Sequence, residues 1–305
     1  MATAPTFQPF RLALVQLGNI GASKDDNLRH AKDMLVKAAS PEDGVKPNLI
    51  VLPECFNSPY GHQFFPEYAE TIGFVTNQPY DVSKSKSQSV KLISETAKQL
   101  STWILGGSIP EKDETDGKVY NTAIVFNPKG DLVTIHRKVH LFDIDIPGKI
   151  TFKESTTLSA GNTLTHFDTE FARIGVGICY DVRFPEMAMI AARRGCAAMI
   201  YPGAFNLTTG PLHWELLQRA RAVDNQIYVA MCSPARDMNA LYHAWGHSTV
   251  MNPMGQVVAT TEEQESIVYA DLDPSLTTTT RAGIPVTTQR RFDVYGDVSE
   301  DSQRA

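Results

Sequence analysis

The same order of predicted strands and helices occurs twice along this chain of 305 residues, and no other sequence feature limits the possible folds as strongly. Three strings of the first half match three strings of the second half in the same order: RLALV matches RIGVG, LIVLPECF matches AMIYPGAF, and NTAIVFNPKGDLV matches HSTVMNPMGQVV. The offset between the copies falls from 162 residues (Arg11 to Arg173) to 125 (Asn127 to Asn252), so the two halves carry different insertions. Chance similarity of short apolar strings is the alternative, and three matches in one order argue against it.

Each half follows the order strand, helix, strand, helix, strand and hairpin. The strands are too uniformly apolar for one of their faces to meet water, so we expect a single α/β domain of two sheets packed face to face, with helices outside. From about residue 274 the periodicity fades, which predicts an extended C-terminal arm over 274–305 with a disordered acidic end. The expected strands are 11–17, 48–54, 103–110, 120–126, 131–138, 172–178, 197–202 and 226–233, with a hairpin over 247–260, and the expected helices are 23–39, 86–100, 184–194 and 211–223.

Charge and cysteine usage limit the setting in which the chain works. A formal net charge of -6 and a pI near 5.8 argue against a nucleic-acid partner. No apolar run is long enough to cross a membrane, and the first ten residues lack the features of a secretory signal. The four cysteines include no C-x-x-C pair, which favours reduced thiols and a cytoplasmic protein. The first ten residues also lack acidic side chains, which is compatible with a mitochondrial transit peptide, so a second, mitochondrial location stays an alternative.

Cys179 is the first candidate for chemistry. It follows an apolar strand through Gly175 and Gly177 and precedes a helix that begins near Pro185, so it can occupy a sharp elbow between strand and helix. There the backbone N–H of Tyr180 would point at the group that the sulfur attacks, and the helix terminus would favour a thiolate. Free cysteines are also common core residues, and this segment alone leaves both interpretations open.

Glu54 and Lys138 are the next candidates, each at the end of its own predicted strand. A carboxylate after a buried apolar run needs a partner or a function, although it could also be solvated. The matching position in the second half is Gly203, so the repeat itself requires no acid there. A lysine at a strand end is commonly exposed to solvent. Together with Cys179, however, the pair supplies a nucleophile, a base and a charge for an oxyanion.

These residues and their strings resemble the nitrilase superfamily of carbon-nitrogen hydrolases over nearly the whole chain. LPECFNSPY carries the family's glutamate at Glu54, HRKVHLFDIDIPGK its lysine at Lys138 and GICYDVRFPE its cysteine at Cys179, and the second glutamate matches Glu154 in ITFKES. The strings HLFDIDIPGKITFKES and YPGAFNLTTGPLHW are similar to the ω-amidase branch, in its fungal form. The resemblance implies an α-β-β-α sandwich, assembled as a homodimer or a higher homo-oligomer, and no cofactor.

The same resemblance implies a reaction. Enzymes of this branch hydrolyse the terminal amide of short dicarboxylic monoamides such as α-ketoglutaramate and α-ketosuccinamate through a cysteine thioester. Glu54 would act as the base, Lys138 and the Tyr180 N–H would hold the oxyanion, and Glu154 would orient the lysine or the base. The pairs of histidines at 136 and 140 and at 243 and 247 flank a strand end and a loop, so we expect no metal site.

Arg183 is the candidate for binding the distal carboxylate of the substrate, because a guanidinium suits a bidentate contact. A structural salt bridge to Asp181 or Glu186 is the alternative. Tyr60 and Phe205 are candidates for the pocket walls. Three rival functions remain: an amidase for deaminated glutathione, an inactive interaction protein on the same scaffold, and a redox sensor that uses the nucleophilic cysteine, for which no resolving cysteine lies nearby in sequence.

Overall fold

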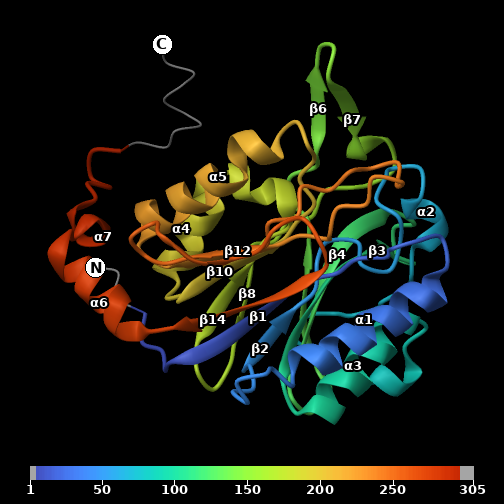
Figure 1. The fold of residues 1–305 in the computed structure, drawn as a ribbon, viewed down its shortest axis with the longest axis horizontal. Coiled ribbons are helices and arrows are strands. Elements are labelled where there is room, and N and C mark those ends of the chain that lie inside the picture. The colour runs from blue at the N-terminus through green and yellow to red at the C-terminus, as the bar shows by residue number, and fades with distance from the viewer. Residues whose placement is uncertain (1–4, 296–305) are drawn as a thin grey trace.

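The computed structural model describes residues 5–295 and forms an α-β-β-α sandwich (Figure 1). The first sheet has the strand order β14-β1-β2-β3-β4-β5 and the second the order β13-β12-β11-β10-β9-β8. In the first sheet lie β1 (Phe10–Gln16), β2 (Leu49–Val51), β3 (Trp103–Lys112), β4 (Val119–Phe126), β5 (Leu132–Arg137) and β14 (Ser266–Leu272). In the second lie β8 (Thr165–Asp168), β9 (Arg173–Val176), β10 (Ala198–Pro202), β11 (Tyr228–Cys232), β12 (Thr249–Met251) and β13 (Val257–Thr260).

Helices cover the outer face of each sheet. The first sheet carries α1 (Lys24–Ala38) and α3 (Gln88–Leu100), and the second carries α4 (Pro185–Arg193) and α5 (Gly210–Asn225) (Figure 1). A small hairpin of β6 (Asp143–Ile146) and β7 (Ile150–Lys153) projects from the sandwich, and α2 (Phe65–Tyr68) is a single turn.

The sequence repeat is confirmed by the strand directions. β1, β2 and β3 run parallel and β4 and β5 follow antiparallel, and the second half repeats this with β9, β10 and β11 followed by β12 and β13. One edge strand of each sheet was not predicted, β14 in the first and β8 in the second, and these two strands are exchanged between the halves. β14, from the end of the second half, pairs with β1, whereas β8, from the end of the first half, pairs with β9. The two sheets therefore complete each other.

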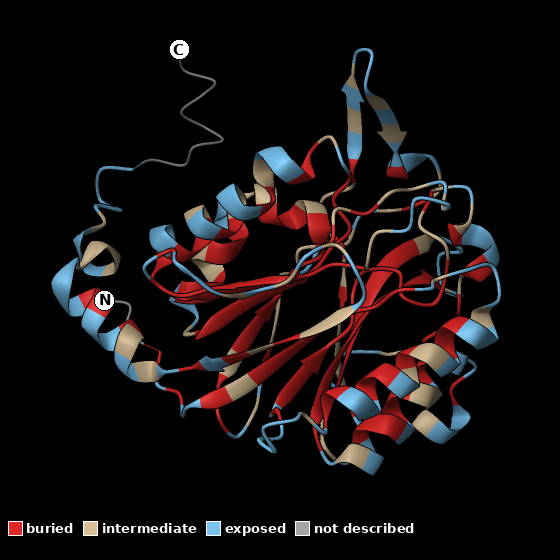
Figure 2. Ribbon diagram, viewed as in Figure 1, coloured by how far each residue is buried: buried red, intermediate tan, exposed pale blue. Residues whose placement is uncertain are grey.

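Alternation along the buried strands builds two apolar layers. In β1, Leu12 and Leu14 belong to the core between the sheets, whereas Ala13 and Val15 pack toward the helices of the first half. On α1 and α3 the apolar stripes face this second layer, as Leu28 on α1 shows. Figure 2 shows the buried strands enclosed between helices whose outer faces are exposed. Strands buried on both faces explain the uniformly apolar runs in the sequence.

The C-terminal segment corrects one prediction, because residues 274–283 and 286–289 are helical and not extended. α6 (Pro274–Gly283) is capped at its N-terminus by Asp273, whose side chain accepts from Ser275 N at 2.8 Å, and α7 (Val286–Gln289) follows. The run of threonines has low helix propensity and hid the periodicity, while Gln226 Nε2 holds the end of α6 by donating to the Thr280 carbonyl. The predicted acidic end, residues 296–305, lies outside the described residues.

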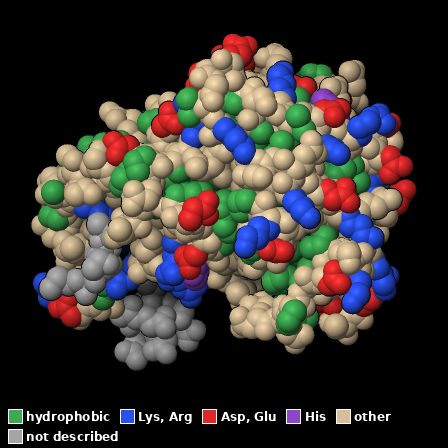
Figure 3. Space-filling model, turned by 90° about the horizontal axis from the view of Figure 1, so that it is seen from below, with side chains coloured by type: hydrophobic (Ala, Val, Ile, Leu, Met, Phe, Trp, Pro, Cys, Tyr) green, Lys and Arg blue, Asp and Glu red, His purple; other side chains and the backbone are tan. Residues whose placement is uncertain are grey.

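In the part of the chain that the structure describes, no helix is both long and apolar enough to span a membrane. Acidic and basic side chains are interspersed over the face seen in Figure 3.

Candidate active site

Cys179 lies at the elbow that the sequence predicts, separated from the end of β9 by Gly177 and Ile178, and it begins the 3-10 helix η3 (Cys179–Arg183). Its φ is +46°, a left-handed value that a residue with a side chain rarely adopts. Two neighbours show how tightly the turn is enclosed. A Cβ added at Gly203 would lie 3.2 Å from the Cys179 Cα, and one added at Gly177 would lie 2.5 Å from the Tyr201 ring. Gly203, the repeat counterpart of Glu54, therefore leaves room for the elbow.

Glu54 follows β2 and is almost fully buried. Its Oε1 accepts from Asn121 Nδ2 at 2.9 Å and from Lys138 Nζ at 3.0 Å, and its Oε2 accepts from Ala204 N at 2.9 Å. The same Ala204 N–H lies 3.4 Å from the Cys179 sulfur. The carboxylate and the thiol thus share one backbone donor, which places them next to each other.

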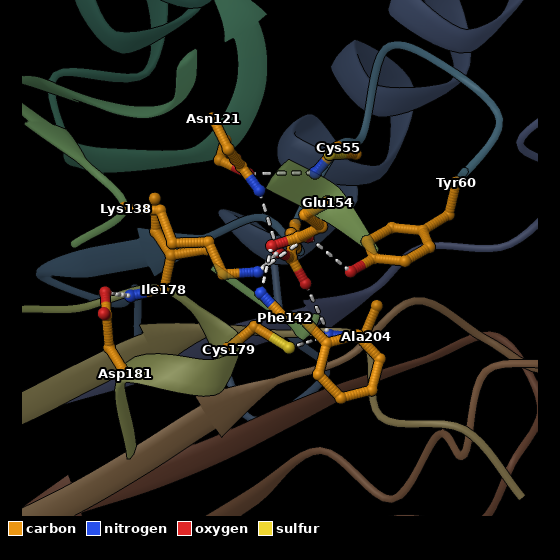
Figure 4. A network of polar contacts seen from close by, with 12 residues as sticks. Cys55, Tyr60, Asn121, Lys138, Phe142, Glu154, Ile178, Cys179, Asp181 and Ala204 are labelled. Carbon is orange, nitrogen blue, oxygen red and sulfur yellow. Dashed lines mark hydrogen bonds and ion pairs between the residues drawn. The ribbon is translucent and has the colours of Figure 1, made fainter. Parts of the chain in front are cut away.

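Lys138 follows β5 and joins the two glutamates. Its Nζ donates to Glu54 Oε1 at 3.0 Å and to Glu154 Oε1 at 2.9 Å, and all three side chains are buried. Glu154 also accepts from Tyr60 Oη at 3.1 Å and from Phe142 N at 2.7 Å. Figure 4 shows Lys138, Glu154 and Cys179 pointing toward a common centre from separate segments. The structure therefore brings together all four residues of the predicted tetrad, Glu54, Lys138, Glu154 and Cys179.

The charges of this group are strongly coupled because water is excluded from it. Burial raises the pKa of Glu54 and the negative charge of Glu154 adds to this, while Lys138 opposes it. Burial lowers the pKa of Lys138, but the two carboxylates outweigh burial and hold that pKa well above its usual value. Burial and then the charge of Glu54 raise the pKa of the Cys179 thiol. At rest the site consequently favours a protonated thiol beside a carboxylate that can accept its proton.

A cavity of about 330 Å³ adjoins the tetrad on the side of Glu54. Tyr60 and Tyr242 line it, and their ring centroids lie 4.4 Å apart. Tyr60 donates to Glu154 of the tetrad, and Tyr242 donates to the carbonyl of Ala204, whose N–H binds Glu54. Tyr60 therefore lies in the wall of a cavity, as expected from the sequence.

Cys179 does not line this cavity, and only 2% of the residue is exposed. Phe205 does not line it either; the Phe205 ring is buried against Trp214, with a centroid distance of 5.3 Å. Tyr180 follows Cys179 within η3, and its ring packs on Phe142.

Arg183 has no carboxylate partner among residues 5–295, so neither of the two alternative salt bridges forms. Its guanidinium lies 4.9 Å from the centroid of the Phe205 ring and 5.4 Å from that of the Tyr180 ring. Nη1 contacts His213 Nδ1 at 3.1 Å, and the buried Nε has no hydrogen-bond partner within the described chain. The structure therefore holds a half-buried cation against aromatic rings, with one donor unused.

Sequence reasoning missed four contributors: Asn121, Asp181, Ala204 and Tyr242. Asp181 was noted only as a partner for Arg183, yet it is fully buried and binds two histidines. An acidic residue so close after the candidate cysteine was a sequence signal that could have identified Asp181. Asn121 and Ala204 act through a single amide each, and Tyr242 lies in a loop, so no local pattern marks them.

Comparisons with known proteins agree with this arrangement. The family described as carbon-nitrogen hydrolase matches residues 11–282. Hydrolase C26A3.11 of Schizosaccharomyces pombe is 57% identical over 292 residues, which cover 96% of this chain and 85% of the relative. Omega-amidase NIT2 of Homo sapiens is 54% identical over 286 residues, covering 94% of this chain and 96% of the relative. The crystal structure of Saccharomyces cerevisiae Nit3, a member of branch 10 of the nitrilase superfamily, superposes with a TM-score of 0.84 at 47% identity and covers 96% of this chain and 100% of that chain.

Proposed function

The chain belongs to the carbon-nitrogen hydrolases, in the ω-amidase branch of the nitrilase superfamily, and we propose that it hydrolyses the terminal amide of short dicarboxylic monoamides such as α-ketoglutaramate and α-ketosuccinamate. The observation that carries this proposal is the buried network in which Lys138 joins Glu54 and Glu154 beside the thiol of Cys179. Relatives named omega-amidases support the choice of substrate class.

In the proposed mechanism Glu54 takes the proton of the Cys179 thiol as the sulfur attacks the amide carbon. The raised pKa of the thiol favours such concerted activation over a stored thiolate. Lys138 and the Tyr180 N–H stabilise the oxyanion, and Glu54 returns its proton to the departing ammonia, leaving a thioester. Water activated by Glu54 then cleaves the thioester and releases the acid. Glu154 and Tyr60 hold Lys138 in place throughout.

The test is ammonia release from α-ketoglutaramate by the wild type, Cys179→Ala and Cys196→Ala. Loss of the nucleophile should lower kcat by roughly 10³-fold or more, since such groups act as a unit. Cys196 is also buried but lies outside the site, so its variant controls for the removal of a core thiol. Intact-protein mass spectrometry should show an acyl adduct in the wild type and in Cys196→Ala but not in Cys179→Ala. Turnover by Cys179→Ala, or the absence of any adduct, would contradict the mechanism.

A substrate panel separates the rivals. The same assay with deaminated glutathione as the substrate should show lower kcat/KM than with α-ketoglutaramate, and the reverse order would move the protein to the sister activity. An inactive scaffold protein would release ammonia from neither compound.

We propose that Arg183 binds the carboxylate at the far end of the substrate. Its support is physical: the guanidinium is half-buried, lies against two aromatic rings and has no carboxylate partner in the described chain. Burial also lowers the pKa of Arg183, which indicates a charge that lacks full compensation. An incoming carboxylate would supply that compensation.

A homodimer is proposed from the outer face of α5. Leu212, Leu216 and Val223 lie there at helical spacing, with half or more of each residue exposed. Val257 of β13 and Leu216 line the same surface hollow, so the apolar strip is continuous with the neighbouring strand. A second copy of the chain would bury this strip.

We also propose a cytoplasmic location. All four cysteines are free and buried, as expected for a reducing compartment. Imaging of a C-terminally tagged protein should show diffuse cytoplasmic signal, and a signal confined to organelles would contradict the proposal.

A further inference from the structure

Asp181, two residues after Cys179, makes contacts that the proposed mechanism does not use. The side chain is fully buried and each of its oxygens accepts twice. Oδ2 accepts from Ile178 N at 2.9 Å and lies 3.2 Å from His136 Nε2. Oδ1 accepts from His140 N at 2.9 Å and lies 2.8 Å from His140 Nδ1.

These four contacts come from two segments, and each segment carries one residue of the tetrad. Ile178 immediately precedes Cys179, whereas His136 and His140 stand two residues on either side of Lys138. β5, which ends just before Lys138, lies in the first sheet, and β9, which ends before Cys179, lies in the second. Asp181 therefore ties the two sheets together at the point where the lysine and the cysteine must meet. Figure 4 shows its carboxylate turned toward the Ile178 N–H.

The backbone at Cys179 needs such a constraint. A positive φ on a residue with a side chain persists only where the surroundings fix it. The bond from Ile178 N to Asp181 closes the turn around the cysteine, and the two histidine contacts fix that turn relative to Lys138. His140 is itself held by stacking on Phe184, with ring centroids 3.6 Å apart. The histidine contacts also keep the Asp181 pKa low in spite of burial.

We propose that Asp181 is a positioning residue that sets the distance between the Cys179 sulfur and the Lys138 ammonium. It touches neither the sulfur nor the ammonium, and acts through Ile178, His136 and His140. The inference rests on the proposed roles of Cys179 and Lys138. It predicts that loosening the clamp slows acylation while substrate binding is kept, because geometry and not affinity is lost.

The first experiment compares Asp181→Asn with Glu70→Gln in the full-length protein. The asparagine has the same shape but presents an N–H₂ to one of the two pairs of donors, so one side of the clamp must open. Glu70 is a matched control, since it is a buried carboxylate bound by Asn57, Ser87 and Ser89, away from both segments. We expect Asp181→Asn to lower kcat for α-ketoglutaramate about 100-fold with KM changed less than about threefold. Glu70→Gln should lower the Tm while keeping kcat.

A second pair of variants keeps the test decisive if Asp181→Asn folds poorly. His140 is partly exposed, and His140→Phe keeps a ring for stacking on Phe184 but loses the Nδ1 donor. His140→Asn keeps a donor near the position of Nδ1. We expect kcat to fall about tenfold for the phenylalanine variant and to recover to within about threefold for the asparagine variant. Equal kcat values for the two, or a near wild-type kcat for Asp181→Asn, would overturn the proposal.

A measurement without substrate separates this inference from the proposed function. Iodoacetamide alkylates the sulfur of Cys179 as iodide leaves, and peptide mapping resolves that site from the other three thiols. Slower alkylation in Asp181→Asn and His140→Phe than in His140→Asn supports the clamp even if no dicarboxylic monoamide is hydrolysed. Unchanged alkylation together with unchanged kcat refutes it.

Discussion

Replacing Arg183 by methionine should separate substrates that carry a carboxylate from those that do not. Succinamate and butyramide form a matched pair, because they differ by a carboxylate in place of a methyl group at the end opposite the amide. A hydrogen bond to a charged partner contributes about 1.5–3 kcal/mol. With 1.36 kcal/mol per tenfold change, kcat/KM for succinamate should fall roughly 10- to 150-fold, and that for butyramide should stay within about threefold.

The structure also predicts where the loss appears. The guanidinium lies 4.9 Å from the centroid of the Phe205 ring and contacts His213, and it makes no hydrogen bond to Glu54, which carries out the proposed proton transfers, so the change should raise KM and spare kcat. Arg183→Lys keeps the charge but not the planar fork, and should fall between the wild type and the methionine variant. Ammonia release gives all the constants, and a Tm for each variant reports the packing lost against the rings. Equal losses for succinamate and butyramide would refute carboxylate binding by this residue.

Three further outcomes can be checked. Tyr60→Phe removes the bond to Glu154, and with about 0.5–1.5 kcal/mol at stake kcat should fall roughly 2- to 10-fold; an unchanged kcat would show that Glu154 is held without it. The base must be ionised and burial raises the pKa of Glu54 above its ordinary 4.5, so kcat/KM should rise with pH along an acid limb centred above pH 4.5, and a limb at or below that value would contradict the assignment. Leu216→Glu places a charge in the apolar strip of α5 and should convert dimers to monomers in light scattering, whereas an unaltered dimer would exclude this face.

The strand ends show how far local patterns reach. Glu54, Lys138 and Cys179 each follow an apolar strand in the sequence, and each lies at the predicted place in the structure. Burial on both faces makes the strands visible as apolar runs, and recurrence of those runs makes the repeat visible. Local patterns do not predict that the three side chains converge, because their convergence depends on how the two sheets lie against each other. For Glu154 and for the choice among amidases, the resemblance to a family was needed.

What the sequence by itself determined is therefore the local part of the molecule: the doubled order of elements, the apolar faces and the reactive residues at the ends of strands. Tertiary structure alone decided the exchange of β8 and β14, the helix over 274–283, the shared amide of Ala204 and the Asp181 clamp. The physical reason is the distance along the chain between the residues that interact. Side-chain periodicity and helix caps are set by neighbours within a few residues, whereas strand exchange and the joining of Lys138 to Cys179 depend on segments from different sheets that meet only when both sheets have packed.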